Sequence, residues 1–136
     1  MKEITVTAMI GNIEAVTAFI DEFLEVIGCP LNTIIQINIA LDEIFSNIVN
    51  YAYPDGEGTV TVGVEETDGT IVIVFKDHGI PYDPLTAKKP DLSLPAEDRP
   101  IGGLGIYMVR KMVDAVSYRH EDGQNMLSLY KMYQKG

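Results

Sequence analysis

The chain has 136 residues, a length that corresponds to one domain with a hydrophobic core of ordinary size. Hydrophobic residues make up 46% of it, which excludes general disorder. The 20 acidic residues outweigh the 10 basic ones, and the net charge of -10 argues against a surface that binds nucleic acid or an anionic membrane. A phosphate ligand stays compatible with this charge, because backbone N–H groups and a metal ion supply a local positive field.

Cysteine content and hydropathy indicate the cytoplasm. Cys29 is the only cysteine, so no disulfide forms within the chain. The first residues hold no apolar stretch typical of a signal peptide, and no run approaches the roughly 18 apolar residues of a membrane span. We therefore expect a soluble cytoplasmic protein whose natural start is Met1.

Hydrophobic periodicity and turn residues divide the chain into helices and strands. Asn12 is a candidate cap for a helix that Gly28 ends, and Pro30 suits the start of a second helix. Asp-Gly pairs at 68–69 and 122–123 predict tight hairpins. The expected elements are, in chain order, a strand 3–9, helices 13–27 and 30–53, strands 58–66 and 70–76, a helix 105–114, and strands 115–121 and 126–133.

Hairpin-joined strands with separate helices indicate an α/β architecture of the α+β type. We expect a two-layer sandwich in which a mostly antiparallel mixed sheet carries its helices on one face, with residues 1–136 as one domain. Residues 78–103 contain five of the seven prolines, and a loop this long inside a compact domain is usually functional. This pattern predicts a lid over a binding site.

A narrow polar stripe follows the apolar face of the second predicted helix. Glu43 and Asn47 are one turn apart, and Asn50 continues the stripe. The Asn oxygen is a hard ligand suited to Mg²⁺, and the Glu carboxylate can accept a proton. The alternative is an ordinary solvated flank of the helix.

Asp77 and Gly79 follow directly on the apolar strand at 70–76. A carboxylate at the end of a strand can accept a hydrogen bond from an exocyclic amine such as that of adenine, and a glycine lets the backbone approach a flat ring. The alternative is a simple exit turn, in which Asp and Gly are favoured for their conformations.

A glycine-rich segment, residues 101–106, opens the last predicted helix. Glycines at a helix start expose free N–H groups at the positive end of the helix dipole, where phosphate often binds. The spacing fits neither a P-loop nor a Rossmann motif. A flexible hinge of the lid is the compatible alternative.

The order and spacing of these features are more specific than any one of them. The segments ALDEIFSNIVNYAY, FKDHGIPYDP and RPIGGLGIYMVRKMVD resemble the motifs of the GHKL (Bergerat-fold) ATPase superfamily, in the right order and across essentially the whole chain. Within it, the chain looks most like the bacterial anti-sigma-factor serine/threonine kinases. Its small size favours that branch over a histidine kinase, which needs a separate pair of dimerisation helices.

The resemblance implies a role for each matching residue. Asn47 would coordinate Mg²⁺, Glu43 would be the general base toward the attacking hydroxyl, and Asp77 would bind the adenine amino group. The implied ATP-binding residues are Asn47, Asn50, Asp77, Gly79, Pro81, Arg99, Gly102, Gly103, Leu104 and Gly105.

Some positions depart from the family pattern. Tyr51 stands where many members carry His or another polar residue. Pro81 occupies the third position of the Asp-x-Gly-x-Gly box, a replacement common in the anti-sigma branch. Arg99 lies near, but not at, the place where some members carry a basic residue, so Lys88, Lys89 and Arg99 are candidates for neutralising phosphate.

The resemblance implies a kinase that transfers the γ-phosphate of ATP to a Ser or Thr of an anti-anti-sigma factor and that sequesters a sigma factor. It also implies a homodimer. Two alternatives stay open. One is a non-catalytic ATP-binding module that switches partner binding, against which the retained Glu43 counts, and the other is an ATPase or histidine-kinase fragment.

Overall fold

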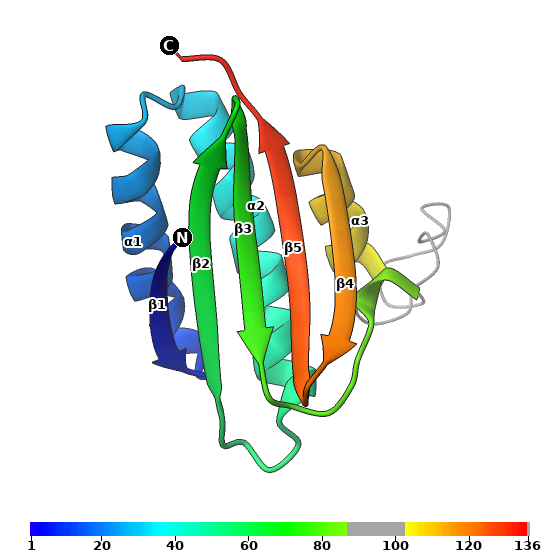
Figure 1. The fold of residues 1–136 in the computed structure, drawn as a ribbon. Coiled ribbons are helices and arrows are strands. Elements are labelled where there is room, and N and C mark those ends of the chain that lie inside the picture. Colours follow the sequence, from blue (N-terminus) through cyan, green and yellow to red (C-terminus); the bar gives the residue numbers. More distant parts are fainter. Residues whose placement is uncertain (87–102, 136) are drawn as a thin grey trace.

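A computed structural model describes residues 1–86 and 103–135, which form a sheet and a layer of helices (Figure 1). The elements are β1 (Lys2–Thr7), α1 (Ile13–Val26), α2 (Leu31–Asn47), a π-helical turn (Ile48–Ala52), β2 (Thr59–Thr67), β3 (Thr70–Asp77), α3 (Gly103–Met112), β4 (Ala115–Glu121) and β5 (Gln124–Met132). Short 3₁₀ turns lie at Ile10–Asn12 and Pro84–Thr86. Among the described residues, no helix is both long and apolar enough to cross a membrane.

The sheet has five strands in the order β1-β2-β3-β5-β4, and each neighbouring pair of described strands is antiparallel. All three α-helices lie on one face of it (Figure 1). The expected two-layer α+β sandwich with helices on one face is therefore confirmed. The end of β3, the end of α2 and the start of β5 meet at the same end of the molecule (Figure 1).

Both predicted Asp-Gly hairpins are present. Asp68 and Gly69 have φ values of 50° and 81°, and Asp122 and Gly123 have values of 54° and 76°. Positive φ at both central residues is the signature of a type I′ turn, whose twist matches that of the flanking strands. The second turn pairs Glu121 with Gln124 and so fixes the register between β4 and β5.

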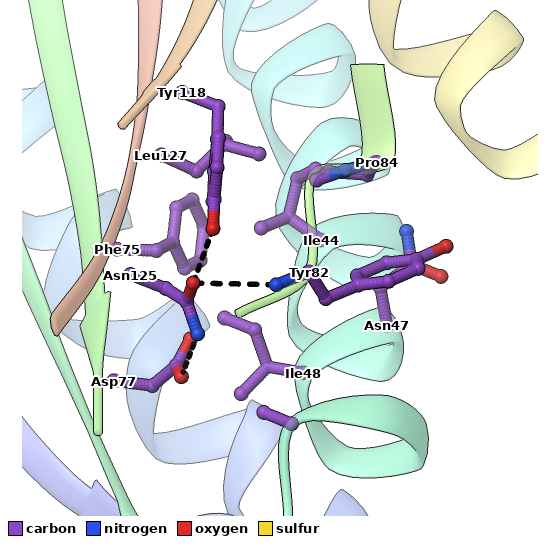
Figure 2. A pocket seen from close by; sticks show the side chains of 11 residues that line it. Ile44, Asn47, Ile48, Phe75, Asp77, Tyr82, Pro84, Tyr118, Asn125 and Leu127 are labelled. Carbon is purple, nitrogen blue, oxygen red and sulfur yellow. Dashed lines mark hydrogen bonds between the residues drawn. The ribbon is translucent and has the colours of Figure 1, made fainter. Parts of the chain in front are cut away.

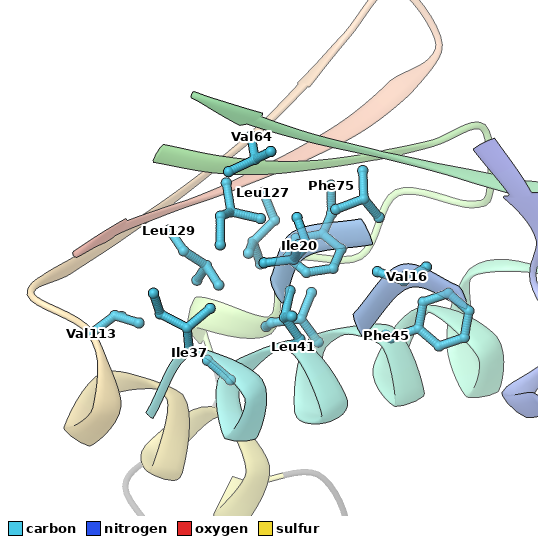
Figure 3. Close-up of a cluster of buried hydrophobic side chains, with 14 of the residues drawn as sticks. Val16, Ile20, Ile37, Leu41, Phe45, Val64, Phe75, Val113, Leu127 and Leu129 are labelled. Carbon is cyan, nitrogen blue, oxygen red and sulfur yellow. The ribbon is translucent and has the colours of Figure 1, made fainter. Parts of the chain in front are cut away.

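The core lies between the sheet and the helices (Figure 3). Alternate residues of each central strand point into it, and α1 and α2 supply apolar side chains at helical spacing. Burial of each such side chain contributes about 1.5–3 kcal/mol, so the core fixes how α2 is rotated against the sheet. Its fully buried members include Val16, Ile20, Leu24, Ile37, Leu41, Ile44, Phe45, Val60, Val62, Ile71, Ile73 and Phe75.

Two local predictions differ from the structure. Asn12 precedes α1 but does not cap it with its side chain. Its Nδ2 instead donates to the carbonyl oxygen and Oγ1 of Thr7, at 3.0 and 2.7 Å, because the end of β1 lies within reach. The second helix does not run regularly to residue 53, since α2 ends at Asn47 and continues as the π-helical turn Ile48–Ala52. Such wider turns are common at functional sites.

Candidate functional site

Polar side chains close one end of the apolar core face. The core-facing residues of β3 are apolar as far as Asp77, the last residue of the strand. Asp77 itself is only 4% exposed. On β5, Asn125 is 5% exposed and begins the core-facing row that continues with Leu127 and Leu129. Asp77 and Asn125 are direct partners in the β3–β5 register. The end of the sheet therefore places a carboxylate and an amide side by side beneath the helices.

The buried carboxylate of Asp77 is held by two donors, one of which, the amide of Asn125, is drawn in Figure 2. Nδ2 of Asn125 and the backbone N–H of Gly79 both donate to Oδ1, each at 2.9 Å. Burying a carboxylate is costly unless such hydrogen bonds replace water. Both bonds end on Oδ1, so Oδ2 receives neither of them.

Asp77 lies in the wall of a pocket between the sheet and the end of α2 (Figure 2). The walls are mainly apolar, with few polar groups, which is the usual character of a small-molecule site. A flat apolar ring that carries an amino group suits this combination. The lining residues are Ile44, Asn47, Ile48, Ala52, Phe75, Asp77, Tyr82, Pro84, Tyr118, Asn125 and Leu127.

The pocket encloses about 30 Å³, which is room for about two water molecules. A purine ring therefore requires some lining residues to shift. Tyr82 and Pro84 come from the loop after β3, whereas the other lining residues belong to strands, to α2 or to its π-helical turn. Tyr82 also stacks on Tyr51, with ring centroids 5.3 Å apart. The loop is the part of the wall that can move at the lowest cost.

Glu43 lies against the first turn of α3. A Cβ atom at Gly105 would stand 2.6 Å from Oε2 of Glu43, so the missing side chain of the glycine is what admits the carboxylate. Asn47, one turn further along α2, lines the pocket. Two of the three residues of the predicted polar stripe, Glu43 and Asn47, thus link the first turn of α3 to the Asp77 pocket.

The donor set near the pocket fits a magnesium–nucleotide complex better than a resident metal centre. Among the residues that the structure describes, no cluster of three or more His, Cys, Asp or Glu side chains is arranged to hold a metal. Mg²⁺ commonly takes only one or two protein oxygens and completes its shell with phosphate and water. Asn47, which lines the pocket, carries a side-chain oxygen of the type that Mg²⁺ accepts.

The remaining predicted site residues have different surroundings. Gly79 is needed for a close approach to protein backbone, since a Cβ there would lie 2.2 Å from the carbonyl oxygen of Ala52. That oxygen also accepts a hydrogen bond from the N–H of Ile80, at 2.8 Å. Asn50 and Pro81 are exposed and do not line the pocket.

Part of the predicted glycine-rich site and lid falls outside the described residues. This applies to Lys88, Lys89, Arg99 and Gly102. Gly103 begins α3, two residues earlier than predicted, and Leu104 belongs to its first turn. The N-terminal end of α3 therefore contains Gly103 and Gly105, two of the glycines for which the sequence predicts phosphate binding.

Sequence reasoning missed Asn125, Tyr118 and Tyr82. The sequence did contain a signal for Asn125. The two-residue turn at 122–123 implies that the next strand begins at Gln124, as observed, and not at the predicted residue 126. Strand alternation then puts residue 125 on the face of Leu127. Tyr118 gave no local signal, since its contact with Asn125 depends on the register between two strands.

Burial raises the pKa of the Tyr118 hydroxyl above its ordinary value. Desolvation is the largest cause, the hydrogen bond with the Tyr82 backbone opposes it, and the negative charges of Asp83 and Asp77 add smaller rises to the pKa. The neutral phenol donates a short hydrogen bond to Oδ1 of Asn125. The polar end of the core is thus a connected network.

Comparison with known proteins gives a consistent family. The sequence-family model of the histidine kinase-like ATPase domain matches residues 6–131 of this chain. Serine-protein kinases RsbW from Bacillus cereus and Bacillus thuringiensis are 28% identical over 104 residues, an alignment that covers 74% of this chain and 65% of each relative. The chain thus spans less than two thirds of the length of these curated relatives.

Solved structures share the fold. The RsbU and RsbW domains of Rv1364c from Mycobacterium tuberculosis superpose with a TM-score of 0.62 and 19% identity, covering 98% of this chain and 33% of that one. The catalytic domain of histidine kinase ThkA gives a TM-score of 0.58 and 12% identity over 100% of both chains. With a family model that matches nearly its full length, the chain belongs to the histidine kinase-like ATPase domain family, within the GHKL superfamily whose motifs it carries.

Proposed function

We propose that this chain is an ATP-binding serine/threonine-protein kinase of the anti-sigma-factor type. It transfers the γ-phosphate of ATP to a Ser or Thr of an anti-anti-sigma partner and sequesters a sigma factor, as a homodimer in the cytoplasm. The observation that carries the proposal is the buried Asp77 carboxylate at one end of an apolar pocket that also contains Asn47. The similarity to serine-protein kinases RsbW supports the choice of kinase type.

Adenine recognition rests on the pocket. Ile44 and Ile48 on one side, and Phe75 on the other, supply apolar surface for the faces of the ring. Oδ2 of Asp77 accepts a hydrogen bond from the adenine amino group, while Oδ1 stays occupied by its two protein donors. Guanine carries an oxygen at that position and would face the carboxylate with an acceptor, which disfavours it.

The phosphates extend from the pocket toward α3. Asn47 would hold Mg²⁺, which neutralises phosphate charge when it is bound. Free N–H groups at the start of α3, in the turn that contains Gly103 and Gly105, would donate to phosphate oxygens. Glu43 accepts the proton of the attacking hydroxyl as that oxygen bonds to the γ-phosphorus and ADP leaves.

Calorimetric titration with ATP and ADP, with and without Mg²⁺, tests the proposal. Asp77→Asn should lower the affinity for both nucleotides about a hundredfold or more. The new amide faces the adenine amino group either with an N–H, which cannot accept a hydrogen bond, or with an oxygen in the wrong position. Asn47→Ala should remove the Mg²⁺ dependence and leave metal-free ADP binding almost unchanged. A wild-type chain that binds neither nucleotide contradicts the proposal.

Matched variants separate site effects from general effects. Asp55→Asn removes one exposed carboxylate in the loop after the π-helical turn, and Asn32→Ala changes an exposed Asn at the other end of α2. Both should bind nucleotides like the wild type. A loss of affinity in either control would assign the effect to charge or folding rather than to the pocket.

A further inference from the structure

Asn125 uses both ends of its amide within the protein (Figure 2). Its Nδ2 donates to Oδ1 of Asp77 at 2.9 Å and to the carbonyl oxygen of Ile80 at 2.8 Å. Its Oδ1 accepts from the hydroxyl of Tyr118 and from the backbone N–H of Tyr82, the latter at 3.5 Å. The amide therefore has no hydrogen-bonding capacity left for a ligand.

This network allows one orientation of the amide. The carboxylate and the carbonyl beside Nδ2 only accept hydrogen bonds, and a backbone N–H beside Oδ1 only donates. A flipped amide would place oxygen against two acceptors, in a residue that is 5% exposed. Asn125 is thus a fixed donor to Asp77.

The hydrogen bonds of Asn125 restrain both Asp77 and the loop after β3. A carboxylate held by a side-chain donor and by the N–H of Gly79 cannot rotate without breaking a buried hydrogen bond. The bonds to Ile80 and Tyr82 hold the loop that contributes Tyr82 and Pro84 to the pocket wall. One side chain therefore connects the base-recognising group to the movable part of the wall.

We infer that Asn125 is a positioning residue for nucleotide recognition, which turns Oδ2 of Asp77 toward the adenine amino group and ties the loop wall to that carboxylate. The inference deepens the proposed function and rests on it. Asn125 touches no ligand in this arrangement and acts through Asp77.

Two substitutions test the inference by titration with ADP. Asn125→Leu keeps a similar size and removes both hydrogen-bonding functions, so ADP affinity should fall about tenfold or more at any pH. Asn125→Asp keeps the shape but places a second carboxylate against Asp77. Such a pair holds one shared proton at low pH, and that proton restores the donor.

The Asp variant should therefore show a pH dependence that a structural defect does not produce. Its ADP affinity should approach that of the wild type at about pH 5.5 and should be about tenfold weaker or more at about pH 9. The wild type, titrated at the same pH values, provides the reference. A deficit of the Asp variant that does not change with pH overturns the inference.

A second ligand tests whether Asn125 acts through the amino group. Purine riboside diphosphate lacks that amine and gains little from Oδ2 of Asp77. Asn125→Leu should lower the affinity for this ligand less than threefold, which corresponds to the loss of one weak neutral contact. The same substitution should lower the affinity for ADP about tenfold or more. Equal losses for both ligands would assign Asn125 a general structural role and overturn the inference.

Ser128→Ala is the control, because Ser128 lies on β5 with its side chain on the opposite face from Asn125 and Leu127. It should bind ADP like the wild type, and thermal unfolding and circular dichroism confirm that each variant is folded. If the wild type does not bind ADP, the proposed function fails. If the wild type binds ADP and a folded Asn125→Leu binds it equally well, the inference alone fails.

Discussion

Glu43 on α2 approaches α3 where Gly105 has no side chain, with Oε2 of the glutamate 2.6 Å from the position of a Cβ at residue 105. The missing side chain of the glycine thus leaves room for the carboxylate in its present position. A carboxylate is also favoured near the N-terminal end of a helix, where the dipole is positive. Two residues far apart in the sequence therefore define one end of the proposed phosphate site.

Gly105→Ala should reduce phosphoryl transfer without unfolding the protein. The added methyl group displaces the end of a flexible Glu side chain, while alanine raises helix propensity by up to about 1 kcal/mol. We expect an unchanged or higher Tm and a transfer rate lower by about tenfold or more. Gly11→Ala is the matched control, because nothing lies within 4 Å of a Cβ there. Unchanged transfer in Gly105→Ala would show that the position of Glu43 is not critical.

Glu43→Gln should separate binding from catalysis. The amide keeps the shape of the side chain but cannot accept the hydroxyl proton, so transfer to an anti-anti-sigma protein should fall by about 10²–10⁴-fold. ADP affinity, measured by calorimetry, should stay within about threefold of the wild type. If wild type and variant bind ATP equally and neither labels a partner, the protein is a non-catalytic ATP-binding module.

Gly79→Ala should destabilise the whole fold. A Cβ at this position would lie 2.2 Å from the carbonyl oxygen of Ala52, and a backbone atom cannot move aside like the end of a side chain. We expect a loss of about 2 kcal/mol or more in the free energy of unfolding, and a fall in Tm of about 5 °C or more. Thermal unfolding followed by circular dichroism measures it. A Tm equal to that of Gly11→Ala would refute the close packing against Ala52.

Asp21→Asn should stabilise the protein at neutral pH. Burial raises the pKa of Asp21, the hydrogen bond from Asn38 lowers it, and the charge of Glu25 raises it again, with a net rise. Oδ1 of Asp21 and Oδ1 of Asn38 are both buried without a hydrogen-bond partner in the described residues. The Asn side chain is neutral, so it removes the cost of a desolvated charge. It also carries an N–H donor, which the carboxylate lacks.

The pH dependence of this stabilisation has a definite sign. A carboxyl group whose pKa is higher in the folded state contributes stability that is complete below its unfolded pKa and is lost as pH rises through the folded pKa. The advantage of Asp21→Asn should therefore be about 0.5–1 kcal/mol near neutral pH, should shrink as the pH falls through the raised pKa of the folded state, and should be largely gone below about pH 4. Glu22→Gln removes the neighbouring exposed charge and should not reproduce it. An advantage that persists at low pH would contradict this account.

Local patterns were enough for much of the fold. The helical spacing in α2 predicted its buried face, and the Asp-Gly pairs predicted both hairpins. The position of Asp77 directly after an apolar strand also predicted a candidate site residue, and the structure places Asp77 in the wall of a pocket. These features depend on neighbours in the chain, since residue period and turn conformation are set over a few residues.

Tertiary structure decided the rest. Asn12 does not cap α1 with its side chain, which instead donates to two oxygens of Thr7 at the end of β1. The contacts between Asn125 and Asp77, and between Glu43 and Gly105, join elements separated by many residues. Such contacts follow from strand register and from how helices pack, and both are settled only when the core forms. The amino-acid sequence alone thus determined the elements and the candidate chemistry, whereas packing determined which polar groups hold one another in place.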